Sequence, residues 1–427
     1  MSDAIVIGGG FSGAMTAAHL AARGVAVSVI EPGALGRGVA YANVRPELLL
    51  NTPARAMSAL ADRPDHFVDY LARRGSSVTF APRHIYGDYL GETIAELAGQ
   101  SLDHISARAV AIRRAERGFA IDCDDGTVRR ARRVVLALGN PSPRTPDAFA
   151  DRPSEYWPDP YRAIAELPAD ASSIALLGTG LTALDVIVGL RARGHRGRIV
   201  AISRRGLVPS SHDRAQPTTI PTMPRELLRQ PSVRTLIAWW RSRIERDISP
   251  AAIVAALRPH LPALWRRLPI AERAKFTRHV RPHWDVLRHR APPSVRALVE
   301  LGRAEGWLET IADRVVSVAR VRAGMRLQLE RSAIAAGYVI NCTGPERDVR
   351  RIESPLVKSL LACGMIASDP LGLGVSCGRN GELGDGAYVV GPWRVADDWE
   401  ATAVPELRVH AAETASAIAT SLDLAAA

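Results

Sequence analysis

Two glycine-rich turns in this chain have the residue types and the spacing that bind phosphate groups through backbone N–H donors. The first, in AIVIGGGFSG, places Gly8, Gly10 and Gly13 in a G-x-G-x-x-G pattern. The second, in ALLGTGLTALD, contains Gly178 and Gly180. In this pattern the first glycine permits a tight turn, the second lets the backbone approach a pyrophosphate, and the third lets a helix pack closely on a strand. The sequence therefore predicts two sites for phosphate-containing ligands.

The elements that must position the first turn are expected on both sides of it. An apolar run at residues 4–7 predicts a buried strand, and a helix is expected from Phe11 to about Arg23, with Ser12 in its first turn. The start of this helix would direct N–H groups and a positive dipole at the phosphates. The next predicted strand, VAVSVI, is followed by Glu31, where a carboxylate can bind a ribose hydroxyl. This combination predicts a dinucleotide site, and the acidic strand end suits FAD.

The second turn leads to a strand that ends differently. Leu181 and Thr182 begin the expected helix, and the strand IVAISRRG then ends in Ser203, Arg204 and Arg205, where an acidic residue would select NADH. A hydroxyl and two guanidinium groups suit the 2′-phosphate of NADPH, because arginine binds phosphate with two parallel hydrogen bonds. The alternative is that arginine is simply abundant in this chain. We predict NADPH at the second site.

A stretch after the first unit, GRGVAYANVRPELLLNTPARAMS, contains further candidates for cofactor contact. Gly38 is followed by Ala40 and Tyr41, which suggests a backbone that passes close to a ligand. Asn51 and Thr52 form a polar kink after an apolar LLL run. The stretch is interpreted either as a surface loop or as a wall of the flavin pocket, and the second interpretation is favoured.

The two halves of the chain repeat one supersecondary plan. After the first turn come HISARAVAIRR, FAIDCD, TVRRARR and VVLALG, and after the second come WLETIADRVVSVAR, MRLQLE and YVINCTG. Each half thus runs from a glycine-rich β-α-β start through a three-strand meander to an apolar strand that ends in glycine, Gly139 or Gly344. Such apolar runs are typical of parallel strands buried on both faces. The predicted fold class is α/β, with two Rossmann-like dinucleotide-binding domains, for FAD and NADPH, and a helical insertion.

The repeat also predicts the domain boundaries. The FAD-binding domain is expected to comprise residues 1–145 and 346–427, and the NAD(P)H-binding domain residues 146–212 and 304–345. Residues 213–303 have no counterpart in the first half and form the insertion.

The insertion carries the candidates for substrate contact. Its segments SVRTLIAWWRSRIE, AAIVAALRPHLPALWRRL and KFTRHVRPHWDVLRHRAPP have apolar residues at helical spacing. Arg281, Trp284 and Arg288 could form part of a lid that attracts an anionic substrate, or the arginines could belong to a solvated face. His212, just before the insertion, could line a cleft or be structural only.

Composition narrows the function classes. With 427 residues, of which 47% are hydrophobic and 23% charged, the chain is typical of a folded globular protein of two or three domains. The net charge of +11 invites a nucleic-acid interpretation. Only two of the 55 basic residues are lysines, however, and the basic residues are spread widely without interleaved aromatic residues. We therefore expect no nucleic-acid partner.

Membrane spans, metal sites and disulfides are not expected either. No apolar stretch reaches membrane-spanning length, and the first apolar run lacks the basic flank of a signal peptide. The four cysteines form no C-x-x-C motif and have no zinc-ligand spacing. Unpaired thiols in a reducing cytoplasm are the expected state, and a dithiol redox centre is disfavoured.

The motifs together resemble a bacterial family of FAD/NAD(P)-binding proteins. The blocks that carry the resemblance are GTGLTALDVIVGLRARGHRGRIVAISRRGLVPSSH, GRGVAY, LLLNTPA and WEATAVPELR. The family includes FAD-dependent urate hydroxylases and the flavoprotein that N-oxygenates aspartate to nitrosuccinate. More distantly, the chain resembles N-hydroxylating and Baeyer–Villiger flavin monooxygenases. In such flavoproteins a helix that starts near Ala403 and Val404 would direct its N–H groups at the flavin pyrimidine oxygen. Trp393 would lie near the flavin ring or be an ordinary packing residue.

The predicted cofactor-contacting residues combine the motifs with this resemblance. They are Gly8, Gly10, Phe11, Ser12, Gly13, Glu31, Pro32, Gly38, Ala40, Tyr41, Asn51, Thr52, Val110, Gly139, Gly178, Gly180, Leu181, Thr182, Ser203, Arg204, Arg205, Gly344, Gly391, Trp393, Ala403 and Val404.

The function that the resemblance implies is that of an NADPH-consuming flavin monooxygenase. NADPH would reduce FAD, and a C4a-(hydro)peroxyflavin would transfer oxygen from O2 to carbon or nitrogen of a small, polar or anionic substrate. The cofactor supplies this chemistry, which agrees with the lack of a catalytic triad or a carboxylate pair in the sequence. Two alternatives stay open. They are an NAD(P)H dehydrogenase or electron-transfer flavoprotein, and a nucleotide-binding regulator without turnover. The oligomeric state and the substrate are left open.

Overall fold

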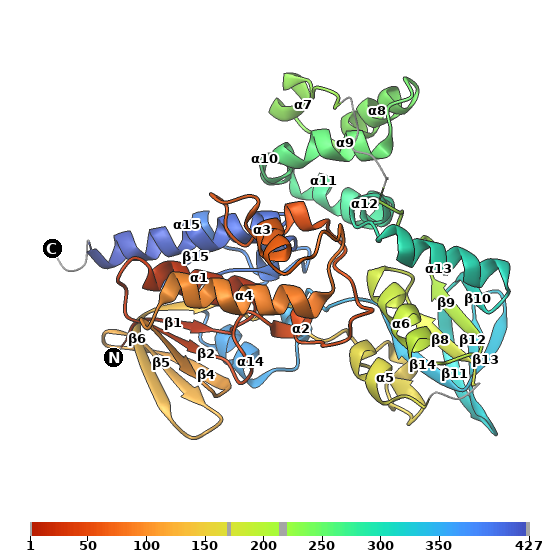
Figure 1. The fold of residues 1–427 in the computed structure, drawn as a ribbon, viewed down its shortest axis with the longest axis horizontal. Coiled ribbons are helices and arrows are strands. Elements are labelled where there is room, and N and C mark those ends of the chain that lie inside the picture. Colours follow the sequence, from red (N-terminus) through yellow and green to blue (C-terminus); the bar gives the residue numbers. More distant parts are fainter. Residues whose placement is uncertain (1, 169–171, 213–219, 424–427) are drawn as a thin grey trace. The chain divides into compact units, whose positions relative to one another are not determined.

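The computed structural model describes residues 2–168, 172–212 and 220–423 (Figure 1). The chain divides into two compact units, and each unit is built from separated stretches of sequence. The first unit comprises residues 1–46, 53–141 and 346–427, and the second comprises residues 47–52 and 142–345.

The first unit is built on an eight-stranded mixed sheet. Its strands are β1 (Ser2–Ile7), β2 (Val27–Ile30), β3 (Leu102–Ile105), β4 (Ala109–Ala115), β5 (Gly118–Cys123), β6 (Val128–Leu136), β15 (Glu382–Gly384) and β16 (Ala387–Val389). Parallel pairing gives the order β3-β2-β1-β6-β16, and β4 and β5 continue from β6 as an antiparallel meander. The central strands are buried on both faces, which explains their apolar runs.

Helices cover this sheet and connect its strands. They are α1 (Phe11–Ala21), α2 (Gly38–Tyr41), α3 (His66–Arg73), α4 (Arg83–Ala98), α14 (Pro355–Ala362) and α15 (Val404–Asp423). Helix α1 follows the first glycine-rich turn and packs against both α4 and α15, the three long helices seen together in Figure 1. All but one residue of α1 is buried, because small side chains such as Ala14 and Ala18 allow close packing.

The second unit repeats the plan with a smaller parallel sheet. Its strands are β7 (Tyr156–Trp157), β8 (Ile174–Leu177), β9 (Ile199–Ser203), β10 (Leu308–Ala312) and β14 (Tyr338–Asn341), in the order β10-β9-β8-β14-β7. Its helices include α5 (Pro160–Glu166), α6 (Leu181–Ala192) and α13 (Pro293–Ala304). A separate antiparallel sheet contains β11 (Val315–Val321), β12 (Gly324–Leu329) and β13 (Ala333–Ala336).

The five parallel strands of the first sheet correspond in position to the five strands of the second, and the architecture confirms the predicted α/β fold class. In order along each sheet, β3-β2-β1-β6-β16 of the first unit matches β10-β9-β8-β14-β7 of the second. The halves differ in how the meander joins the parallel sheet. Residues 128–136 form a single strand that serves both meander and parallel sheet, although the sequence pattern suggested two segments. In the second unit Gly337 interrupts the corresponding path between β13 and β14.

The middle of the chain forms the expected group of helices. They are α7 (Arg225–Arg229), α8 (Val233–Ile244), α9 (Pro250–Leu257), α10 (Leu261–Arg267), α11 (Ile270–Lys275) and α12 (Arg281–Arg288), with a π-helical turn at Phe276–Val280. Ser232 and Ser249 cap α8 and α9 with their side chains. The predicted start of the insertion, residue 213, lies in the range 213–219, outside the described residues.

The helical group has a hydrophobic core of its own. Trp239, Ile253, Leu257, Leu264 and Trp284 are buried together in it. Helix α13 lies inside the predicted range 213–303 but packs elsewhere. It leads directly into β10, and its Val299 is buried with residues of the parallel sheet of the second unit.

Candidate dinucleotide sites

The first glycine-rich turn separates two roles of glycine. Gly8 has a φ of +100°, and a Cβ placed on it would lie 2.2 Å from the carbonyl oxygen of Ala137. A Cβ on Gly13 would lie 1.9 Å from the carbonyl oxygen of Gly8. At Gly10, the N-cap of α1, an added Cβ would meet only the Cα of Gly38, at 3.6 Å. The fold itself requires Gly8 and Gly13, whereas Gly10 leaves its surroundings open at the start of the helix.

Glu31 lies directly beside this turn, as its spacing predicts. One carboxylate oxygen, Oε2, accepts the N–H of Gly9 at 2.8 Å, and Oε1 accepts the N–H of Gly33 at 3.0 Å. A Cβ on Gly9 would lie 2.7 Å from Cγ of Glu31. Gly9 was missed as a site residue in the sequence, although the unbroken GGG run was a signal for it. Pro32, the next residue after Glu31, is exposed.

The stretch at residues 36–41 also reaches the first turn. The N–H of Gly36 donates to the carbonyl oxygen of Gly9 at 2.8 Å. Gly38 has a φ of +48°, and a Cβ on it would lie 3.1 Å from Cα of Gly10. Ala40 is exposed. The phenol of Tyr41 has its pKa raised to about 12 by burial, so it stays protonated.

Asn51, Thr52 and Val110 are placed differently from this group. Asn51 and Thr52 belong to the second unit, where Nε2 of His212 donates to the carbonyl oxygen of Asn51 at 2.8 Å. Val110 lies in β4 at a break in its pairing register with β5. The structure thus brings together His212 and Asn51, which the sequence had singled out separately.

The C-terminal segment joins the first turn at the end of the sheet. Gly391 has a φ of +86°, and a Cβ on it would lie 3.1 Å from Oγ of Ser12. Nε1 of Trp393 donates to the carbonyl oxygen of Gly139 at 2.8 Å, and this indole is buried in the core of the unit. The residues Ala403 and Val404 stand where a helix was predicted to begin, and α15 does begin at Val404.

A buried polar network lies between this segment and α15. Asp398 and His410 are both buried, and Nε2 of His410 lies 2.9 Å from Oδ2 of Asp398. Burial by itself raises the pKa of Asp398, but the hydrogen bond and the charge of His410 outweigh it and hold the pKa below its usual value. No sequence motif predicted this pair, because its members are brought together only by the packing of α15.

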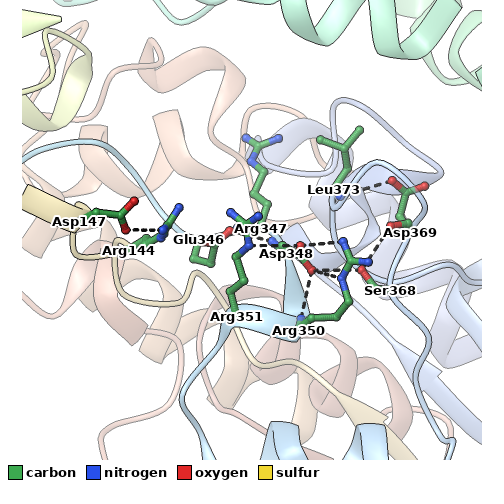
Figure 2. Close-up of polar contacts among 10 residues, drawn as sticks. All are labelled: Arg144, Asp147, Glu346, Arg347, Asp348, Arg350, Arg351, Ser368, Asp369 and Leu373. Carbon is green, nitrogen blue, oxygen red and sulfur yellow. Dashed lines mark hydrogen bonds and ion pairs between the residues drawn. The ribbon is translucent and has the colours of Figure 1, made fainter. Parts of the chain in front are cut away.

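The loop that returns the chain to the first unit has a second network of charges (Figure 2). Nε and Nη2 of Arg350 both donate to the carboxylate of Asp348 at 2.8 Å, and the Ser368 hydroxyl donates to it at 3.3 Å. The Arg350 hydrogen bonds hold the pKa of Asp348 below its usual value. The nearby Asp369 carboxylate accepts the N–H of Leu373 at 3.3 Å. These carboxylates fix the segments on both sides of α14, since Asp348 binds Arg350 of its own loop and Ser368 beyond the helix.

The second glycine-rich turn reproduces the geometry of the first. Gly178 has a φ of +117°, and a Cβ on it would lie 2.4 Å from the carbonyl oxygen of Cys342. Cys342 stands two residues before Gly344, as Ala137 stands two before Gly139. A Cβ on Gly180 would meet nothing within 4 Å. In each unit the first glycine thus packs against the residue that follows the neighbouring strand, β6 or β14, and the space beside the second glycine is open.

The strand end after β9 combines a fixed hydroxyl with exposed arginines. Oγ of Ser203 lies 2.9 Å from Oγ1 of Thr179 and accepts the N–H of Gly206 at 3.1 Å, so this hydroxyl shapes the turn. Arg204 and Arg205 are exposed beside it. Nη2 of Arg205 donates to a carbonyl oxygen of the π-helical turn at 3.4 Å. Leu181 and Thr182 form the first turn of α6.

The substrate-side candidates lie on one short helix. Arg281 and Arg288 are the first and last residues of α12, and Pro282 stands in its first turn rather than interrupting it. Nε of Arg281 donates to Asp285 at 3.2 Å. Trp284 is buried in the core of the helical group, edge-on to Trp240 with ring centres 6.4 Å apart.

Thiol, metal and membrane features can be assessed over the described residues. All four cysteines are without disulfide bonds, and burial raises the pKa of the thiols of Cys342 and Cys377, the latter to about 12. Within the same residues, no group of three or more His, Cys, Asp or Glu side chains could hold a metal ion. Among the helices of residues 2–423 that are described, none has the length and hydropathy to span a membrane.

Comparison with known proteins agrees with this architecture. Residues 5–141 match a protein family described as FAD-NAD(P)-binding. L-lysine 6-monooxygenase from Pseudomonas syringae is 16% identical, with a TM-score of 0.66 over 99% of this chain and 100% of that one. The structure of Kutzneria sp. 744 ornithine N-hydroxylase with reduced FAD, NADP+ and L-ornithine is 14% identical, with a TM-score of 0.64 over 99% of this chain and 100% of that one.

Two further structures show how widely this fold is used. The FAD-bound cadaverine monooxygenase from Erwinia amylovora is 15% identical, with a TM-score of 0.66 over 98% of this chain and 94% of that one. A thioredoxin reductase from T. acidophilum is 10% identical, with a TM-score of 0.55 over 99% and 98% of the two chains. No curated protein matches the sequence. The chain therefore has an FAD-NAD(P)-binding domain and shares the fold of flavin-dependent oxidoreductases, N-hydroxylating monooxygenases among them.

Proposed function

We propose that the protein is an FAD-dependent, NADPH-consuming monooxygenase that hydroxylates carbon or nitrogen of a small, polar or anionic substrate. The observation that carries the proposal is the repeated turn geometry. Each unit presses its first glycine against the neighbouring strand and leaves the second open, at Gly10 and Gly180. Open turns followed by helices are the geometry that binds a pyrophosphate, so the two turns support two dinucleotide sites.

The residues of the first unit fit FAD. The N–H groups at the start of α1 would bind the pyrophosphate, and Glu31, already fixed by the N–H groups of Gly9 and Gly33, would accept from the ribose hydroxyls. The start of α15 would stabilise negative charge on the flavin pyrimidine. Bound FAD supplies the hydride acceptance and the reaction with O2. The chain's own task is to hold the cofactor and to exclude water from the reacting centre.

The second unit fits NADPH. Arg204 and Arg205 are exposed at the end of β9, where the 2′-phosphate of a bound NADPH would lie. Ser203 supports the same turn from within. The positive charge of this strand end would select NADPH over NADH.

Monooxygenation is favoured over disulfide reduction by the state of the cysteines. The fold serves both chemistries in other proteins, so the site must decide between them. Cys342 and Cys377 have raised thiol pKa values and form no C-x-x-C pair. Both properties are unfavourable for thiol exchange, which needs a thiolate. Unpaired cysteines also favour a reducing compartment such as the cytoplasm.

The substrate class is proposed from the structural comparisons and from the resemblance interpreted from the sequence. The structures that share the fold include enzymes named for lysine, ornithine and cadaverine, all small polar amines. The sequence blocks resemble urate hydroxylases and an aspartate N-oxygenase, whose substrates are anionic. Arg281 and Arg288 on α12 are the residues we propose to attract an anionic group.

The decisive experiment measures which products are formed when NADPH is oxidised. The purified protein, loaded with FAD, is mixed with NADPH and O2 in the presence of amino acids, diamines, small dicarboxylates or urate. NADPH consumption, hydrogen peroxide and hydroxylated product are measured together. We expect one substrate class to increase NADPH consumption and to lower the peroxide released per NADPH. Reduction of artificial electron acceptors without any hydroxylated product would overturn the proposal in favour of a dehydrogenase.

Cofactor selectivity is tested on the same protein. Arg204→Ala should raise the KM for NADPH about tenfold or more, because a charge-assisted hydrogen bond contributes about 1.5–3 kcal/mol. The KM for NADH should stay unchanged, since NADH lacks the 2′-phosphate. Equal use of the two nucleotides by the unmutated protein would contradict the assignment of NADPH.

A further inference from the structure

A third arginine lies beside the strand end that carries Arg204 and Arg205. Strands β9 and β10 are parallel, with Ser203 paired to Ala312, so both strands end at the same edge of the sheet. The N–H of Asp313 donates to the carbonyl oxygen of Ser203 at 3.0 Å. The turn after Arg205 also lies close to the end of β10, because a Cβ on Gly206 would lie 3.0 Å from Cβ of Ala312.

Arg331 is held at this edge by residues 312 and 313. It stands in the turn between β12 and β13, and its Nη2 donates to the carbonyl oxygen of Ala312. Its Nε lies 3.7 Å from Oδ2 of Asp313. Its Nη1 makes no hydrogen bond with the residues that the structure describes, and 72% of the side chain is exposed. The guanidinium is thus fixed on one side and open on the other.

Asp313 fixes the backbone of Arg331 as well as its side chain. The Asp313 carboxylate is 3% exposed and accepts the N–H groups of Arg314 at 2.8 Å and Arg331 at 3.1 Å. Burial by itself raises its pKa, but these hydrogen bonds and the charge of Arg331 hold the pKa below the usual value. The ionised Asp313 carboxylate is buried, and the N–H groups that it accepts offset its negative charge. It therefore repels a nearby anion less than an exposed carboxylate would.

The charges at this edge therefore favour an anion. Three arginines, Arg204, Arg205 and Arg331, come from two different loops. An arginine held by a carboxylate and a carbonyl loses less side-chain freedom when it binds a phosphate than a free one would.

We propose that Arg331 is a third determinant of NADPH specificity, which binds the 2′-phosphate together with Arg204 and Arg205, and that Asp313 is its positioning residue. The inference deepens the proposed function and rests on its assignment of NADPH to the second unit. No sequence motif marks Arg331, because it lies 126 positions after Arg205 and reaches the site only through the β12–β13 turn.

The test compares ligands that differ in the 2′-phosphate. Calorimetry on the FAD-loaded protein measures the Kd of 2′,5′-ADP and of NADP+ and NAD+, and kinetics give the KM for NADPH and NADH. Arg331→Ala should weaken 2′,5′-ADP and NADPH about tenfold and leave NADH unchanged. The matched control is Arg326→Ala, which removes an exposed arginine from the middle of β12 in the same small sheet and should change neither KM.

The positioning role of Asp313 has its own measurement. Asp313→Asn should raise the KM for NADPH and not that for NADH. In the Arg331→Ala background the same substitution should have no further effect on the ratio of the two KM values. A purely structural role of Asp313 would instead change both KM values and the FAD content in either background.

The possible failures are distinguishable. A wild-type protein that uses NADH as well as NADPH overturns the assignment of NADPH itself. If the wild type prefers NADPH and Arg331→Ala keeps as much of this preference as Arg326→Ala does, only the proposed role of Arg331 is overturned. If Arg331→Ala loses FAD or stability, Arg331→Gln keeps the length and polarity of the side chain without its charge, and the same criteria apply to it.

Discussion

At the scale of single residues, the two turns distinguish glycines needed by the fold from glycines needed by a ligand. Gly10→Ala adds a methyl group that meets the protein only at 3.6 Å, yet it stands where a pyrophosphate must approach the backbone. We expect normal folding and a large loss of bound FAD, measured by the flavin absorbance per protein and by the Tm of the FAD-free protein.

Two other glycines serve as controls for this prediction. Gly13→Ala should destabilise the protein itself, since its Cβ would lie 1.9 Å from a carbonyl oxygen. Gly91→Ala, in α4 with nothing within 4 Å, should leave FAD content unchanged and raise stability by about 0.5–1 kcal/mol, because alanine favours a helix interior more than glycine does. Full FAD content in Gly10→Ala would show that the cofactor does not lie over this turn.

The Asp398–His410 pair predicts a pH dependence of stability. The folded pKa of Asp398 lies below its usual value, so the carboxylate contributes stability above about pH 4, and this contribution is lost as the pH falls through the folded pKa. Asp398→Asn should lower the stability by about 1–3 kcal/mol at neutral pH. The difference in the free energy of unfolding between Asp398→Asn and the wild type should become smaller below pH 4. Thermal unfolding across pH measures this, with the exposed Asp385→Asn as the control. A constant difference at all pH values would refute the ionic role of Asp398.

At the scale of elements, α12 carries the substrate-side candidates. Arg288→Ala should raise the KM for an anionic substrate or increase the hydrogen peroxide released per NADPH, because the substrate is no longer held while the flavin is reduced. FAD content and the rate of flavin reduction without substrate should stay unchanged. The measurement is product and peroxide per NADPH consumed.

The control for Arg288 comes from the same helical group. Arg234→Ala on α8 removes one exposed arginine and should leave coupling and KM as in the wild type. If Arg288→Ala behaves like Arg234→Ala, the arginine at the end of α12 belongs to a solvated face, as the sequence interpretation had also allowed.

The elements also show which features the sequence could predict. The strand before Gly8, the helix after it and Glu31 were all predictable, because they are adjacent in sequence and their spacing is set by local geometry. The packing of α13 on the parallel sheet was not, because helical periodicity gives an apolar face without naming its partner. The contact of His212 with Asn51, 161 residues apart, was hidden for the same reason.

At the scale of the whole molecule, the repeat makes the two nucleotide sites separable. Gly180 in the second unit has the open geometry of Gly10 in the first. Gly180→Ala should therefore raise the KM for NADPH while FAD content stays normal, the reverse of the result expected for Gly10→Ala. Parallel loss of both cofactors in Gly180→Ala would mean that the second turn supports the first unit instead of a nucleotide.

The net charge of +11 adds a salt dependence that differs between the two nucleotides. NADPH carries about two more negative charges than NADH, since the 2′-phosphate is largely doubly ionised at neutral pH. The arginines proposed to meet it are exposed, so their attraction is screened once the Debye length falls from about 20 Å to a few ångströms. Raising NaCl from about 0.02 M to about 0.5 M should lower kcat/KM for NADPH several-fold and that for NADH much less. The measurement is the ratio of the two values at constant FAD content. A ratio that stays constant with salt would mean that the chain's positive charge is spread too evenly to favour the phosphorylated nucleotide, whatever its total.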